Sequence, residues 1–207
     1  MRFLQYFKIP SEKTQVDLLH DVLVKLLHSH GSYHGHHDSA NGGDTATQLS
    51  STNKSNAENS VLFEAVNLVI LYGPDCPEEL RETAVNLLGR FVGNSRDANL
   101  RYLAVDALTR LAKLDGPAGV EPFMPAIFDA MKDTDISLRR RALTLLFVMA
   151  SERTARKIVS ELVLHLPLAE PVMKEDVVVK VSRGVYDCFF IVMALKRSQK
   201  LPHRTLL

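Results

Sequence analysis

Three segments of this 207-residue chain share one helical template, and this repetition constrains the fold more than any other feature of the sequence. Residues 80–91, 100–111 and 138–149 each begin with Leu-Arg and place apolar side chains at offsets of 0, 4, 7, 8 and 11. Such offsets line up apolar groups on one face of an α-helix, and an alanine at offset 4 lets a neighbouring helix approach closely. A chain that repeats such a stripe can bury it only by stacking helices on one another.

The distances between the copies indicate how the helices pair. The second and third copies begin 38 residues apart, which suits a two-helix repeat of HEAT or armadillo size. The first two copies begin only 20 residues apart, so we expect them to be the two helices of one pair. Asp97 and Asp135 lie three residues before the second and third copies, where they predict helix N-caps. Gly89, inside the first copy, predicts a tight helix contact.

Helical spacing of apolar residues also covers segments 19–27, 59–72, 120–132 and 158–166. We therefore predict an all-α fold, specifically a right-handed α-solenoid of HEAT/armadillo-like helical pairs. Residues 1–28 are expected to form one helical segment and residues 58–182 the helical repeats. Between them, residues 29–57 are polar and rich in histidine, which predicts a disordered insertion.

Cysteine and histidine usage gives no support for a metal or redox site. Cys76 and Cys188 form no CxxC pair, which indicates a reducing compartment, and Cys76 has no nearby base to make it a nucleophile. Six of the eight histidines lie between His20 and His37. Clustered imidazoles can bind zinc, but no cysteine or carboxylate stands at a convincing ligand spacing, so we expect a solvated linker and no metal or cofactor.

Charge and motifs point away from nucleic acid and from catalysis. The net charge is +1, without the excess of Lys and Arg that a nucleic-acid binder concentrates on one face. The sequence has no GxGxxG, P-loop, GxSxG or HExxH motif. No apolar run approaches the roughly 20 residues that cross a bilayer. We expect a cytoplasmic binding scaffold rather than an enzyme.

The densest basic cluster is the candidate binding surface. Arg140 and Arg141 lie in the third copy of the template, and Arg153, Arg156 and Lys157 follow on the next predicted helix. Together these five residues could face acidic lipid headgroups or an acidic partner segment, since each basic group adds about 1 kcal/mol near an anionic surface. In the alternative interpretation they lie on a solvated face, and the preceding Arg139 pairs with aspartate side chains between repeats.

Four stretches of the sequence resemble the adaptins, the large subunits of the clathrin adaptor complexes. These are residues 55–66 (SNAENSVLFEAV), 87–91 (LLGRF), 99–104 (NLRYLA) and 135–142 (DISLRRRA). The first stretch, and RFLQYF at residues 2–7, are most similar to the alpha type, which belongs to the plasma-membrane complex. The resemblance ends near residue 182, so residues 183–207 are a divergent tail, which we interpret as the product of an unspliced or mispredicted transcript.

The resemblance implies a scaffold portion of an adaptor large subunit in clathrin-mediated endocytosis and vesicle-mediated protein transport. The implied partners are a beta large chain, a medium chain and a small sigma-type chain, with clathrin and membrane phosphoinositides engaged indirectly. The implied location is the cytoplasmic side of plasma-membrane coated pits, peripheral to the membrane. A gamma-type adaptin at the Golgi or endosomes, or a free-standing HEAT/armadillo transport adaptor that binds peptides, remains an alternative.

Overall fold

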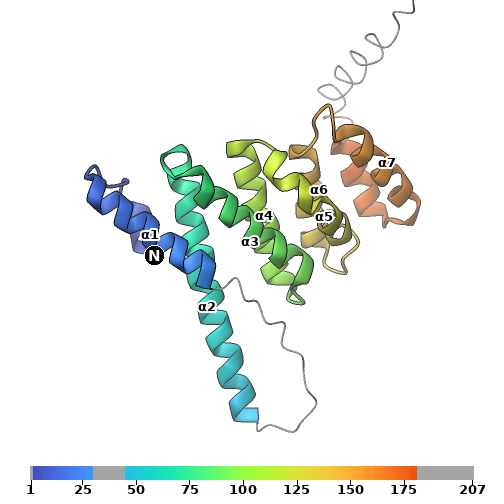
Figure 1. Cartoon of the computed structure of the whole chain (residues 1–207). Coiled ribbons are helices and arrows are strands. Elements are labelled where there is room, and N and C mark those ends of the chain that lie inside the picture. Colours follow the sequence, from blue (N-terminus) through green and yellow to red (C-terminus); the bar gives the residue numbers. More distant parts are fainter. Residues whose placement is uncertain (1, 30–44, 181–207) are drawn as a thin grey trace, which may run out of the picture.

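The computed structural model describes residues 2–29 and 45–180, and within these ranges every regular element is a helix (Figure 1). The α-helices are α1 (Lys13–Ser29), α2 (Thr45–Tyr72), α3 (Glu78–Asn94), α4 (Ala98–Asp115), α5 (Met124–Ala130), α6 (Ile136–Val148) and α7 (Ala155–His165). A further α-helix covers 171–180. Short 3₁₀ helices lie at η1 (Arg2–Tyr6), η2 (Gly73–Asp75), η3 (Ala118–Phe123) and η4 (Leu166–Leu168).

The helices stack as pairs in two rows. Helices α1, α3 and α5 contact one another in sequence along one row, and α2, α4 and α6 do so along the other. Within the pairs, α1 packs on α2, α3 on α4 and α5 on α6. The first copy of the template is thus the partner helix of the second, and the second and third copies, α4 and α6, occupy equivalent places. The predicted all-α solenoid of HEAT/armadillo-like pairs is confirmed.

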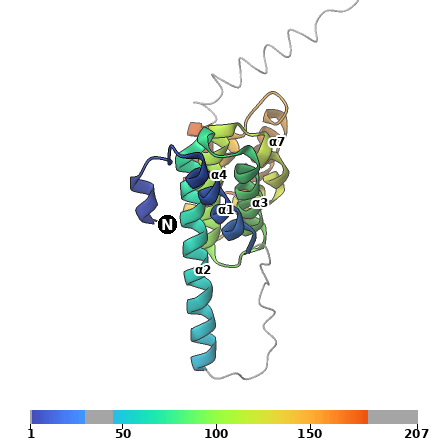
Figure 2. The same ribbon diagram turned by 60° about the vertical axis from the view of Figure 1, so that its left-hand side comes forward.

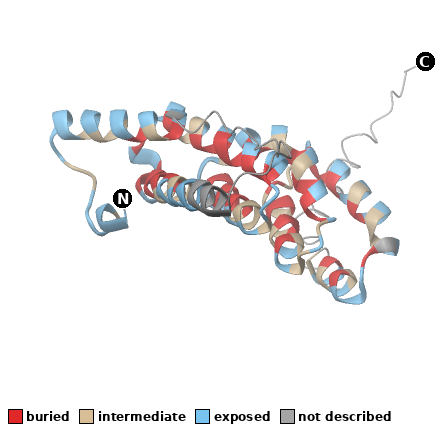
Figure 3. Ribbon diagram, turned by 90° about the horizontal axis from the view of Figure 1, so that it is seen from below, coloured by how far each residue is buried: buried red, intermediate tan, exposed pale blue. Residues whose placement is uncertain are grey.

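The template residues form the seam between these helices. Of their apolar positions all but Leu100 are buried, including Leu88 on α3, Leu108 on α4 and Leu146 on α6. Burying a leucine side chain contributes about 1.5–3 kcal/mol, so the repeated stripe supplies much of the stabilisation. The buried residues, red in Figure 3, follow the length of the molecule between the stacked helices. One continuous apolar cluster therefore runs from Leu23 on α1 to Val177 near the end of the described chain.

Helix α2 begins earlier than the sequence predicted. The insertion was expected to extend from 29 to 57, but α1 includes Ser29 and α2 starts at Thr45. The first half of α2 projects beyond the other helices in both views (Figures 1 and 2). This half has almost no apolar stripe, and for that reason periodicity missed it. The whole of α2, from Thr45 to Tyr72, contains no Gly or Pro, so no residue in it breaks the helix. Residues 30–44 and the predicted tail 183–207 lie outside the described residues.

Both predicted aspartate caps are confirmed. The carboxylate of Asp97 accepts the amide hydrogen of Asn99 at 2.8 Å at the start of α4. At the start of α6, Asp135 accepts from the amide of Ser137 at 2.7 Å. Such bonds satisfy amides that have no partner in the first helical turn, and each stabilises the helix by about 1 kcal/mol.

Gly89 lies where Phe123 of η3 packs tightly against α3. A Cβ atom built on Gly89 would collide with the ring of Phe123. The predicted tight contact at this glycine is therefore present, and Phe123 packs over bare helix backbone there. Gly93, one turn later on the same helix, differs because its added Cβ would only reach ordinary contact with the Cβ of Ala126 at 3.8 Å.

We predict opposite effects of alanine at these two glycines. Gly89→Ala should lower the free energy of unfolding by about 1–3 kcal/mol, because the Phe123 ring must move. Gly93→Ala should leave it unchanged or raise it by up to about 1 kcal/mol, because alanine favours helix. Urea denaturation followed by circular dichroism measures both. Equal stability of the two variants would contradict the contact, as would failure of Phe123→Leu to restore part of the loss in Gly89→Ala.

Candidate functional site

The arginine of each template copy ties its helix to another part of the stack. Arg81 on α3 donates from Nε to Asp115 at the end of α4, at 2.8 Å. Arg101 on α4 forms an ion pair with Asp133, just before α6, and donates from Nε to the carbonyl oxygen of Val92 at 3.1 Å. These partners lie 34 and 32 residues along the chain, so each arginine crosses between helical elements.

Arg139 on α6 repeats this arrangement one step further. Its Nη2 lies 3.1 Å from the carboxylate of Glu170, just before helix 171–180. Arg139 pairs between helical elements as expected, but its partner is a glutamate and not the predicted aspartate. Burial first, and then the positive charges of Lys132 and Arg139, lower the pKa of the nearby His165 imidazole. This shift favours the neutral form of the imidazole beside Arg139.

The Arg101–Asp133 pair is the most enclosed of these ties. The two side chains are 17% and 15% exposed. The backbone amide of Asp135 donates to Asp133 at 3.0 Å, and this bond, together with the charge of Arg101, holds the pKa of Asp133 below its usual range against the opposing effect of burial. The folded protein therefore favours the ionised carboxylate, and the pair links stability to pH.

The five basic residues of the predicted binding surface differ in their partners and in their exposure. Arg140 donates from Nε to Asp176 on helix 171–180 at 2.6 Å. Arg141 lies 2.9 Å from Asp106 on α4, donates to the hydroxyl of Tyr102 at 2.7 Å, and stacks over the ring of the same tyrosine. That hydrogen bond and the charge of Asp106 raise the pKa of Arg141, against the effect of burial. Both guanidinium groups thus bridge neighbouring helices of the row that contains α6.

The other three basic residues lie beyond the far end of α6. Arg153 reaches back to Glu121 on η3 at 2.8 Å, yet its side chain remains 81% exposed. Arg156 and Lys157, in the first turn of α7, are exposed and have no hydrogen-bond or ion-pair partner among the described residues. The cluster therefore divides into two paired arginines on α6 and a more accessible group at the start of α7.

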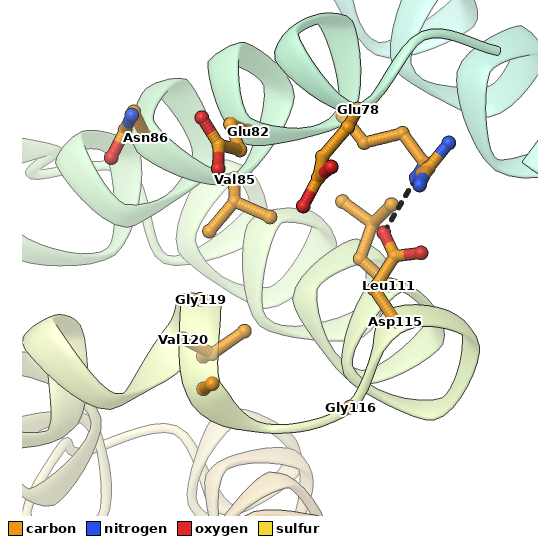
Figure 4. A pocket seen from close by; sticks show the side chains of 11 residues that line it. Glu78, Glu82, Val85, Asn86, Leu111, Asp115, Gly116, Gly119 and Val120 are labelled. Carbon is orange, nitrogen blue, oxygen red and sulfur yellow. Dashed lines mark hydrogen bonds and ion pairs between the residues drawn. The ribbon is translucent and has the colours of Figure 1, made fainter.

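A groove opens between α3, the end of α4 and the start of η3 (Figure 4). Its volume is 540 Å³. Val85, Leu111 and Val120 line it and are buried, so its floor is apolar. In Figure 4 the carboxylate of Glu78 points from α3 toward the space between α3 and the start of η3. Glu82, one helical turn later, lines the same groove.

Negatively charged side chains outnumber positively charged ones along this groove. Three carboxylates line it, those of Glu78, Glu82 and Asp115, against the one guanidinium of Arg81. Arg81 is already engaged by Asp115 and by the carbonyl oxygen of Gly73 at 3.2 Å. Within the described chain neither Glu78 nor Glu82 has a side-chain partner. The sequence analysis missed this site. The signals that could have found it are Glu78 and Glu82, one helical turn apart, and the two glycines that follow α4, Gly116 and Gly119.

Of the cysteines and clustered histidines considered from the sequence, Cys76, His20 and His28 lie in the described ranges. Cys76 is buried, and this burial raises the pKa of its thiol to about 11, so the thiolate is scarce at neutral pH. His20 and His28 lie on α1, whereas the other four clustered histidines fall in the 30–44 segment outside the described residues. In the described ranges, groups of three or more His, Cys, Asp or Glu that could hold a metal ion are absent. Over the same ranges, none of the helices has the length and apolar character needed to cross a bilayer.

The family model and the similar proteins found by comparison all belong to one family. The family described as "Adaptin N terminal region" matches residues 8–185. AP-2 complex subunit alpha-2 of Dictyostelium discoideum is 33% identical over 184 residues, which is 88% of this chain and 17% of that protein. AP-2 complex subunit alpha-1 of Arabidopsis thaliana is 34% identical over 183 residues, 88% of this chain and 16% of that protein.

A gamma subunit is similar as well. AP-1 complex subunit gamma-2 of Arabidopsis thaliana is 33% identical over 166 residues, covering 79% of this chain and 19% of that protein. The match to the alpha subunits thus extends over more of the chain at a similar identity. In each comparison the chain spans less than a fifth of the length of the relative.

We predict that Arg101→Ala destabilises the stack more than Arg110→Ala does. Arg101 is enclosed, and removing it leaves Asp133 without its counter-charge, so the cost should be about 1–3 kcal/mol. Arg110 is 45% exposed, pairs with Asp106 on its own helix and donates to the side-chain oxygen of Asn67 on α2 at 2.6 Å. Because these contacts are exposed to solvent, the loss of Arg110 should cost under about 1 kcal/mol. Urea midpoints at pH 7 compare the two variants.

The same pair predicts a pH dependence with a definite sign. Because the pKa of Asp133 is lowered in the folded state, its stabilisation is complete above the unfolded pKa of about 4 and is lost as the pH falls through the folded value. Asp133→Asn should therefore lose the stability difference from the wild type as the pH decreases from 5 toward 3, as measured by urea midpoints. A difference that stays constant over this range would contradict the coupling.

Proposed function

The chain belongs to the adaptin family, within its N-terminal region, and from this we propose that it is a scaffold segment of a clathrin adaptor large subunit of the alpha type. Its proposed role is to hold other adaptor subunits in clathrin-mediated endocytosis, without catalysis. The stack of helical pairs carries this proposal, because an extended solenoid offers a long surface on which several partners can bind at once. The longer alignments to AP-2 alpha subunits favour the alpha type.

The proposed partners are a beta large chain, a medium chain and a small sigma-type chain, and through them clathrin. We place the assembled complex at plasma-membrane coated pits, peripheral to the membrane. A stiff scaffold suits such an assembly, because partners bind with less loss of entropy to a surface that is already ordered. The ties from Arg101 to Asp133 and from Arg139 to Glu170 support stiffness, since each fixes one helical pair against the next.

We predict that affinity purification of the tagged chain from cells recovers a small sigma-type chain with a medium chain and a beta chain. Mass spectrometry identifies the subunits, and AP-2 subunits in place of AP-1 subunits would distinguish the alpha from the gamma type. A matched bait with Gly89→Ala tests whether the intact stack is required. Recovery of no adaptor subunit would contradict the proposed function, and recovery of AP-1 subunits alone would favour the gamma alternative.

For the basic residues, we propose that the group at the start of α7, namely Arg153, Arg156 and Lys157, is the part that meets an anionic partner or lipid surface. Arg140 and Arg141 instead serve mainly to join helices, since both are paired with carboxylates of other helices and are less exposed than Arg153, whose side chain is 81% exposed despite its pairing with Glu121. The exposure of Arg156 and Lys157 without partners supports this division.

We predict that Arg156→Glu with Lys157→Glu weakens binding to vesicles containing phosphoinositides by about tenfold or more, since each basic group contributes about 1 kcal/mol. Lys113→Glu, an exposed charge change at the end of α4, provides the matched control and should change binding less than twofold. Vesicle co-sedimentation of the purified adaptor complex measures the effect. Equal vesicle binding by the double variant and the control would show that Arg156 and Lys157 do not contribute to binding of an anionic membrane.

A further inference from the structure

The groove beside α3 has features that neither the family match nor the scaffold role requires. Its floor is apolar, formed by Val85, Leu111 and Val120, and two glutamates stand above that floor on one face of α3. Glu78 and Glu82 are four residues apart, so their Cβ atoms lie about 5–6 Å from each other on the helix surface. A long side chain entering here would pass apolar groups along its stem and meet carboxylates at its tip.

The excess of negative charge in the groove indicates which class of ligand can bind there. The guanidinium of Arg81 is 15% exposed and is held by Asp115 and by backbone oxygens, so it does not neutralise the two glutamates. Both glutamates are exposed, so an anionic ligand would be repelled by their carboxylates, and a neutral ligand would gain nothing from them by charge. A cationic group therefore complements the groove.

The opposite wall allows a peptide backbone to approach. It consists of the residues that join α4 to η3 and of the start of η3, and both Gly116 and Gly119 line the groove there. An added Cβ on either glycine would meet nothing within 4 Å. Gly116 has a φ of +85°, which favours glycine because it closes the end of α4, whereas Gly119 has no such requirement. The lack of a side chain at Gly119 thus keeps the groove open without serving the packing of the described chain.

From these observations we propose that the groove docks a segment of a partner protein that inserts an arginine flanked by apolar residues. The methylene stem of the arginine lies on Val85, Leu111 and Val120, since long basic side chains cover apolar surface while their charged tips stay polar. The planar guanidinium, with five donors, reaches the carboxylates of Glu78 and Glu82. The volume of 540 Å³ exceeds that of one side chain and accommodates the flanking apolar residues. This inference names a partner chemistry for the proposed scaffold, but it does not depend on which adaptor complex the chain joins.

The test uses a fluorescein-labelled seven-residue peptide with arginine at its centre and leucine on each side, titrated with the purified chain. Fluorescence polarisation should detect binding that weakens with added salt. Replacing the arginine by citrulline, its neutral isostere, should weaken binding about tenfold or more, as should Glu78→Gln combined with Glu82→Gln. Glu79→Gln, at an exposed neighbour on α3 outside the groove, is the matched control and should stay within about twofold.

A second variant tests the groove by shape rather than by charge. Gly119→Phe should block the groove and weaken binding by a similar factor, while circular dichroism and the urea midpoint stay as in the wild type. No binding at 1 mM chain, or equal binding of the arginine and citrulline peptides, would overturn the proposal. Self-association that disappears in the Glu78→Gln/Glu82→Gln variant would assign the groove to a second copy of the chain and would also overturn it. Because no other adaptor subunit takes part, failure here is distinct from failure to recover an adaptor complex.

Discussion

The structure depends on apolar stripes that no single helix can cover. Helix α4 illustrates the constraint, since it contacts α2, α3 and α6 and buries Ala104, Leu108 and Leu111 against them. The removal of these apolar stripes from water makes the largest favourable contribution to the free energy of folding. It occurs only when successive helical pairs lie side by side. Stacking is therefore a consequence of the amphipathic repeat, and the elongated surface on which partners can bind follows from the stacking.

The Leu-Arg dipeptide couples this apolar seam to polar ties. In each copy the leucine lies in or against the core, and the arginine that follows it is at the edge, where it reaches a carboxylate in another element. The apolar contacts are non-directional and would allow neighbouring pairs to slide. A guanidinium fixed on a carboxylate and on backbone oxygens specifies one arrangement. Arg140 and Arg141 continue this pattern along α6, since each is paired with a carboxylate of another helix.

Much of the architecture could be predicted from the sequence, because it rests on local periodicity and capping. The template located α3, α4 and α6, and Asp97, Asp135 and Gly89 have the expected roles. The start of α2 could not be predicted in this way, since a polar helix without breakers has no stripe to detect. The groove was missed because Glu78 and Gly119 come together only through the packing of α3 against η3. The pairing of Arg140, Arg141 and Arg153 was missed because their carboxylate partners lie 32–36 residues away.

Residue-resolved hydrogen exchange in a Leu108→Ala variant tests the stacked seam most directly. Leu108 is fully buried in α4, and in a solenoid its loss weakens nearest neighbours first. The account predicts reduced amide protection in α2, α3, α4 and α6, with protection in α7 close to that of the wild type. An equal loss of protection in every helix would contradict it, because that result describes a single globular core rather than a stack of pairs.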